Sequence, residues 1–188
     1  MEEAVHNGMP VLLLSAGQAG ATAPASIAGA VAQALSEVIA GLIYVNAMKP
    51  GHPCICGTWP FVSDLRTGAM SGGSGEQGLL TAACAQMLQY YDLPGGAAAG
   101  MADAKMPDAQ SGYEKGSTLV MAGLSGLNMV YEAAGMHASL LGFCLDSLII
   151  DNDMLGQCLR CVRGIEVNEE TLAVQVMKDI CMGGPGHY

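Results

Sequence analysis

The chain has 188 residues, which is enough for one domain with a sizeable core. Its formal net charge is −10 with only 7 lysines and arginines, and this argues against nucleic-acid binding, because phosphate contacts need clustered basic side chains. Hydrophobic residues make up 51% and charged residues 13%, so apolar surface is left over for a membrane, an oligomer interface or further parts of the same fold.

Four short apolar runs are predicted to be strands, because each follows a turn or breaker and precedes glycine-rich sequence and then a helical stretch. They begin about 42 residues apart, and this even spacing indicates repeated βα units. The predicted strands cover 11–15, 54–58, 96–101 and 138–144. Short, uniformly apolar strands that alternate with helices favour a parallel sheet covered by those helices.

Helices are predicted between and after these strands. The first runs from Pro24 to about Met48, with apolar residues at helical spacing. The others cover about 76–91, 113–134, 154–163 and 169–182, the last capped by Asn168 and ended by Gly183. Because a closed (β/α)₈ TIM barrel needs about 250 residues, we expect a partial barrel of about four βα units. It would form a single α/β domain over 1–188, truncated at both ends. An open doubly wound sheet stays the alternative.

The longest apolar stretch, 27–45, is long enough to span a bilayer. It contains Gln33, Ser36 and Glu37 and lacks a basic cluster before it, so we expect no membrane segment. The acidic start lacks the basic region of a secretory signal, and the cysteine count is odd at 7. These features favour a cytoplasmic protein.

In either architecture, ligands bind at the carboxyl ends of the strands, in the loops that lead to the helices. Three aromatic residues share that predicted end with seven carboxylates: Trp59, Phe61, Tyr113, Asp64, Glu76, Asp103, Asp108, Glu114, Asp146 and Asp151. Carboxylates and rings together suit an ammonium ion through charge and cation–π attraction. A purely structural interpretation is equally open, since loops are polar and carboxylates favour helix starts.

Other motifs are weaker. A G-x-G-x-x-G match at 73–78 lies far beyond its strand and lacks the acidic residue that a dinucleotide site needs. Cys158 and Cys161 form a single CxxC without a second pair, so buried thiols are favoured over a zinc site. His137 is predicted to open the fourth strand and is a candidate ligand or base. A turn position at the bottom of the barrel favours a structural role instead.

Several strings resemble the trimethylamine methyltransferase family, in order and over essentially the whole chain. They are SAGQAGATAP (15–24), GTWP (57–60), DLRTG (64–68), SGGSGE (71–76), PDAQSGYEKG (107–116), NMVYEAAG (128–135), DNDM (151–154) and GGPGHY (183–188). The resemblance implies a TIM barrel that moves a methyl group from a methylated amine to the cobalt of a separate corrinoid protein. It also implies that members extend beyond both ends of this chain.

The resemblance leaves the methyl donor open. Archaeal trimethylamine enzymes of the family carry pyrrolysine near the third βα loop, where this chain has only ordinary residues. Relatives without pyrrolysine include glycine betaine methyltransferases, so trimethylamine and a quaternary amine are both expected donors. No cofactor or metal is expected on the chain itself, because the partner protein carries the corrinoid, and the full-length enzyme is expected to be a homo-oligomer.

From their loop positions, six residues are predicted to bind substrate: Glu76, Asp103, Asp108 and Glu114 as carboxylates, with Tyr113 and Trp59 as walls. No catalytic residue is assigned. One alternative is a different barrel enzyme for a small anionic substrate, for which only Arg66, Lys105 and Lys115 are available as basic groups. The other is an inactive or structural paralogue that binds a partner.

Overall fold

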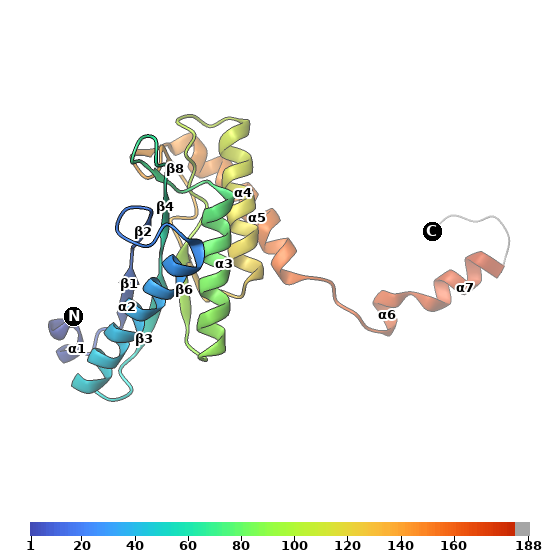
Figure 1. Ribbon diagram of the computed structural model, residues 1–188. Coiled ribbons are helices and arrows are strands. Elements are labelled where there is room, and N and C mark those ends of the chain that lie inside the picture. The colour runs from blue at the N-terminus through green and yellow to red at the C-terminus, as the bar shows by residue number, and fades with distance from the viewer. Residues whose placement is uncertain (183–188) are drawn as a thin grey trace.

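The structure is a computed structural model that describes residues 1–182 (Figure 1). Its main sheet has four parallel strands in chain order, β1 (Val11–Ser15), β3 (Cys54–Thr58), β6 (Gly95–Ala98) and β7 (Met129–Tyr131). The predicted arrangement of four adjacent parallel strands in chain order is confirmed, but only three of the predicted strands belong to it, and the first two have the predicted bounds. The third overlaps its prediction and ends earlier.

Four helices follow these strands: α2 (Ile27–Met48), α3 (Gly75–Tyr90), α4 (Ala109–Leu124) and α5 (Leu145–Arg163). Each helix packs against the next, so the helices form one layer beside the sheet (Figure 1). A sheet in chain order with its helices on one face is compatible with an arc of a (β/α)₈ barrel, whereas doubly wound sheets carry helices on both faces.

The two faces of the sheet differ sharply. Val11 and Leu13 of β1 are buried on the helical face, where a Cβ on Gly41 of α2 would lie 3.1 Å from the Leu13 side chain. On the opposite face, Leu12 and Leu14 are 43% and 50% exposed. That second face is therefore an open apolar surface within the described part of the chain.

The fourth predicted strand, 138–144, is wrong, and the predicted helix over 113–134 exists but begins at Ala109 and ends ten residues too early for its predicted bounds. Helix α4 ends at Leu124, Gly126 adopts φ 81°, and the side chain of Asn128 accepts a hydrogen bond from Gly95 N at 2.9 Å, which leads the chain into β7. Residues 138–144 instead connect and complete a hairpin of β8 (Met136–His137) and β9 (Gly142–Phe143). The even repeat was misleading because the strand-like composition of 138–144 belongs to this hairpin.

A second small sheet lies beyond the carboxyl ends of β1 and β3. Its strands are β2 (Gln18–Ala19), β4 (Phe61–Ser63) and β5 (Met70–Ser71), with β2 parallel to β4 and β4 antiparallel to β5. The long loop after β3 therefore forms a hairpin beyond that end of the sheet (Figure 1).

The ends of the chain add three short helices. Helix α1 (Glu2–His6) packs on α2, while α6 (Glu169–Leu172) and α7 (Val174–Met182) extend away from the body (Figure 1). The predicted helix over 169–182 is broken at Ala173, which has φ 48°, although the capping role of Asn168 is confirmed. Its predicted end at Gly183 lies outside the described residues. The predicted helix over 154–163 begins earlier, at Leu145.

Helix α2 is long and apolar enough to cross a membrane by length and composition. One side of it, including Ala34, Leu35 and Val38, is buried in the core cluster that it shares with β1, β3 and α3. Part of its apolar surface thus lies inside the domain, while Ile43 and Tyr44 are exposed.

Candidate functional site

A cluster of aromatic side chains from the ends of β3 and β7 and from β4 lies at the carboxyl end of the main sheet. The Trp59 ring centroid is 4.6 Å from that of Phe61 and 5.6 Å from that of Tyr131, with the second pair nearly perpendicular at 80°. Backbone pairing places these rings, because Trp59 N donates to Ser15 O and Phe61 N donates to Gly17 O. The main sheet thereby continues into the small sheet and carries the rings with it.

The cluster faces the open side of the sheet. A Cβ on Gly96 would lie 3.2 Å from the Tyr131 ring and 3.5 Å from the side chain of Ile55. Ile55 and Trp59 lie an even number of positions apart along the extended chain, so their side chains lie on the same face of the sheet. The Trp59 ring also contacts the Tyr131 ring. Glycine at position 96 thus leaves room for the rings above the sheet.

Three buried polar atoms of this cluster have no hydrogen-bond partner among residues 1–182: Trp59 Nε1, Tyr131 OH and Glu132 Oε2. Buried polar groups are normally paired, so these three atoms are free to bind a ligand or water. Burial raises the pKa of Glu132, and burial together with the nearby Glu132 charge raises the pKa of Tyr131. Glu132 also adopts φ 61°, a strained conformation for glutamate.

Asp103 is the centre of a second polar group at the same end. Its carboxylate accepts hydrogen bonds from Ser71 Oγ at 2.5 Å, Gly72 N at 2.8 Å and Ser139 Oγ at 2.7 Å. Asp103 thus joins the loop after β6 to the β4–β5 and β8–β9 hairpins.

These same hairpins enclose a pocket of about 620 Å³, lined by charges of both signs from Asp64, Arg66, Asp103 and Lys105. Asp64 and Arg66 pair at 3.2 Å, and hydrogen bonds from the Arg66 backbone and side chain hold the pKa of Asp64 below its usual value. Arg66 is otherwise exposed.

The six predicted site residues are spread over this end of the fold. Trp59 lies in the aromatic cluster and Asp103 in the pocket wall. Glu114 is buried in α4, where it accepts hydrogen bonds from Asp103 N at 2.8 Å and Ala104 N at 3.1 Å, so it holds the loop that carries Asp103. The remaining three are exposed, and one of them, Asp108, caps α4: Glu76, Asp108 and Tyr113.

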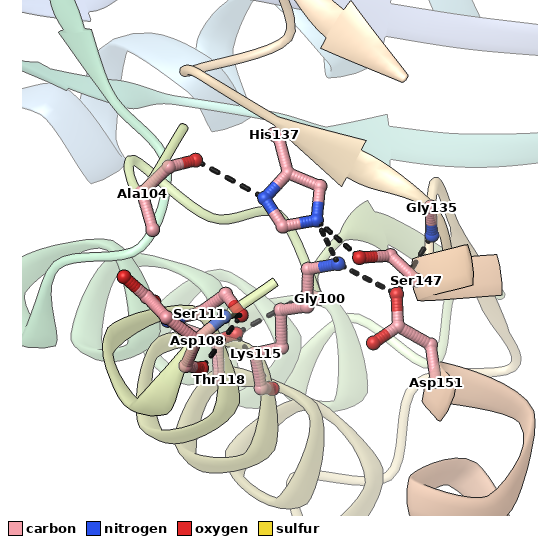
Figure 2. A network of polar contacts seen from close by, with 10 residues as sticks. All are labelled: Gly100, Ala104, Asp108, Ser111, Lys115, Thr118, Gly135, His137, Ser147 and Asp151. Carbon is pink, nitrogen blue, oxygen red and sulfur yellow. Dashed lines mark hydrogen bonds and ion pairs between the residues drawn. The ribbon is translucent and has the colours of Figure 1, made fainter. Parts of the chain in front are cut away.

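The sequence reasoning missed Tyr131 and Glu132, because both fell inside a predicted helix. It also missed a buried polar network between α4, α5 and β8, drawn in Figure 2. His137 belongs to that network at the carboxyl end of the sheet, so its predicted place at the bottom of the barrel is wrong. The only sequence signal for Tyr131 and Glu132 was that they belong to the family-like string NMVYEAAG at 128–135.

Ser147 and His137 form a close pair, with 2.5 Å between Ser147 Oγ and His137 Nε2. They are only 2% and 3% exposed, so a substrate could not reach the hydroxyl as a nucleophile. Within residues 1–182, no group of three or more histidines, cysteines or carboxylates is placed to hold a metal ion. Of the CxxC pair, Cys158 is buried as predicted, whereas Cys161 is exposed.

Comparison with known proteins gives these observations a context. The chain is 35% identical over 177 residues to a glycine betaine methyltransferase of Desulfitobacterium hafniense, and 37% identical over 176 residues to a trimethylamine methyltransferase of Methanosarcina barkeri. Each match covers 94% of this chain and 37% or 35% of the relative, so the chain spans little more than a third of these relatives' length. Residues 1–188 also match the family described as trimethylamine methyltransferase. The chain belongs to the trimethylamine methyltransferase family.

Proposed function

We propose that this chain is part of a (β/α)₈-barrel enzyme that transfers a methyl group from a methylated amine to the cobalt of a corrinoid carried by a partner protein. Relatives named for trimethylamine and for glycine betaine support the donor class, since both compounds carry three methyl groups on nitrogen. The corrinoid acceptor follows from the family resemblance. Because the partner carries the corrinoid, the chain itself needs no residues that ligate cobalt.

The open apolar face of the sheet supports the barrel. In a (β/α)₈ barrel the helices form the outer ring, and the other face of every strand points to the interior. Exposed Leu12 and Leu14, opposite the helical layer, are what an arc of such a barrel would present. The aromatic cluster would then lie at the carboxyl-terminal mouth of the barrel, where barrel enzymes have their active sites.

The observation that carries the proposal is the cluster of Trp59, Phe61 and Tyr131 beside Glu132. An N-methylated ammonium has few or no N–H donors, so it is bound by ring faces and by charge rather than by many hydrogen bonds. We define these four residues as the amine box. Asp103 lines the charged pocket at the same end of the sheet, and the other predicted residues remain parts of the proposal: Glu76, Asp108, Glu114 and Tyr113.

The chemistry assigns clear tasks to the amine box. The corrinoid, when bound, supplies a reduced cobalt nucleophile for the methyl carbon. The nitrogen must carry positive charge before it leaves, and a quaternary amine already has that charge. A tertiary amine has that charge once protonated, as it is in neutral water. The rings hold the cation, and the Glu132 carboxylate pairs with it.

A methyl-transfer assay tests the proposal. The full protein that contains this chain is mixed with a cobalt(I) corrinoid protein, and the visible spectrum of the corrinoid is followed with trimethylamine, glycine betaine or methanol. Transfer from at least one amine, dependent on the corrinoid protein, is expected. A preference for methanol would overturn the cation site, and no transfer from any donor would favour the paralogue. Cytoplasmic location and a homo-oligomeric state remain expectations of the same proposal.

A further inference from the structure

We propose that Lys115, His137 and Asp151 form a buried clamp that positions the amine box without touching the substrate. This inference rests on the proposed function and adds positioning residues to it. The clamp joins α4, β8 and α5. Lys115 and Asp151 are 36 residues apart in the sequence.

Each member of the clamp is buried. Lys115 is 1% exposed, and its Nζ donates to Asp151 Oδ2 at 2.6 Å and lies 3.3 Å from His137 Nε2 (Figure 2). Asp151 Oδ2 also accepts from Gly135 N at 2.7 Å, while Ser147 Oγ lies against His137 Nε2. One ammonium therefore binds a carboxylate and an imidazole from two other elements.

The contacts of His137 fix the orientation of its ring. Its Nδ1 lies 3.1 Å from Ala104 O, which can only accept, so Nδ1 donates this hydrogen bond. Its Nε2 lies against Lys115 Nζ and Ser147 Oγ. The clamp thus holds one ion pair and one histidine ring that joins this pair to the backbone at Ala104.

The clamp lies on a strained segment, residues 132–140, which we call the left-handed loop. Glu132, Ala138, Ser139 and Leu140 all have positive φ, at 61°, 51°, 54° and 72°. Non-glycine residues are disfavoured in this region, and they persist only where the surroundings over-determine them.

The bonds that over-determine the left-handed loop run through the clamp. Asp151 binds the loop at Gly135, and His137 shares the acceptor Ala104 O with Ala138 N. The loop begins at Glu132 of the amine box and reaches Asp103 through Ser139 Oγ at 2.7 Å. Holding this loop therefore sets the positions of two carboxylates at the candidate site.

Stability alone does not explain a buried ion pair of this kind. Desolvating both charges offsets most of their attraction, and apolar replacements of such pairs are often neutral or stabilising. A fixed, uniquely oriented pair instead selects one conformation, and here that conformation is the left-handed loop.

The test compares three variants of the full protein. The double substitution Lys115→Met with Asp151→Asn removes both charges together and keeps an acceptor for Gly135 N. His137→Asn keeps the donor to Ala104 O and removes the contacts with Lys115 and Ser147. Leu88→Ala, in the apolar core at the other end of the sheet, is the control for lost stability.

Four quantities are measured: unfolding temperature, KM for the amine, kcat for the amine, and amide hydrogen exchange over residues 132–143. We expect both clamp variants to raise the amine KM about tenfold or more and to lose protection in the left-handed loop, whereas Leu88→Ala lowers the unfolding temperature with KM unchanged. If the double variant fails to fold, His137→Asn decides.

Wild-type KM values in the folded clamp variants would overturn the clamp, as would a KM rise of the same size in Leu88→Ala. Failure of the wild-type protein to demethylate any amine would instead overturn the proposed function. In that case the exchange data still report whether the clamp orders the loop, so the two failures are distinguishable.

Discussion

The first two βα units have an apolar core, whereas the last two bury several charged side chains. The core shared by β1, α2, β3 and α3 is apolar, with Leu13, Val38 and Leu80 among its most buried residues. The units that contain α4 and α5 bury Glu114, Lys115, His137 and Asp151, and they contain the left-handed loop. The first half of the molecule is therefore an apolar frame. The second half contains strained backbone and buried charges, which hold a few side chains in place at the carboxyl end of the sheet.

The largest effect is expected from breaking the clamp on one side only. Lys115→Met leaves the Asp151 carboxylate buried without its cation, which should cost about 3–5 kcal/mol of unfolding free energy. Adding Asp151→Asn should recover much of that loss, because no unpaired charge remains. Urea unfolding of both variants measures the difference, and equal stabilities would show that the pair is not electrically coupled.

Removing a ring of the amine box should affect binding and spare folding. Trp59→Leu keeps an apolar side chain and removes the π face, so affinity for a quaternary ammonium should fall by about 2 kcal/mol, or roughly 30-fold. Calorimetric titration with glycine betaine measures this change. The matched variant Tyr90→Leu, exposed on α3, should bind as the wild type does, and a similar loss in both would place the amine elsewhere.

Glu132 should make stability and binding respond to pH in opposite directions. Because burial raises its pKa, the protonated form is favoured on folding, and stability without ligand should fall as the pH rises from 4.5 through the raised value. Affinity for a permanent cation should rise over the same window, by about tenfold or 1.4 kcal/mol. Glu132→Gln should abolish both trends. A wild-type pH profile in that variant would exclude Glu132 as the titrating group.

The smallest effect concerns the left-handed loop. Ala138→Gly relieves a positive φ of 51°, and the gain should exceed the entropy that glycine loses on folding by about 0.5 kcal/mol. The same change at Ala34, a buried helical residue of α2, should instead destabilise the protein. Thermal unfolding of the two variants checks the sign, and destabilisation at both positions would mean that the loop is not strained.

The sequence predicts the regular half of the molecule better than the other half. The strands at 11–15 and 54–58 were predicted to the residue, because short apolar runs after proline are characteristic of buried strands. Strand β7 was missed, since three residues carry little pattern and a glycine such as Gly126 only weakly signals a helix end.

Some residues of the candidate site could likewise be predicted from the sequence, and others could not. Trp59 and Asp103 followed from loop position alone, and the structure places both at the carboxyl end of the sheet. Glu132 was hidden by the missed strand. The pairing of Lys115 with Asp151 spans 36 residues and two helices, so nothing local in the sequence indicates it. Such tertiary contacts can be recognised only once the folded structure is known.

The most direct test of the amine box uses choline and its neutral isostere 3,3-dimethylbutan-1-ol. Trp59 is the only tryptophan among the 188 residues, so the fluorescence difference between the wild-type protein and Trp59→Phe reports on the amine box. We predict that choline changes this Trp59 signal with saturation, and that the alcohol, which has the same shape without the charge, binds at least about tenfold more weakly. Equal responses to both ligands, or none to choline, would contradict the assignment of a cation site to Trp59, Tyr131 and Glu132.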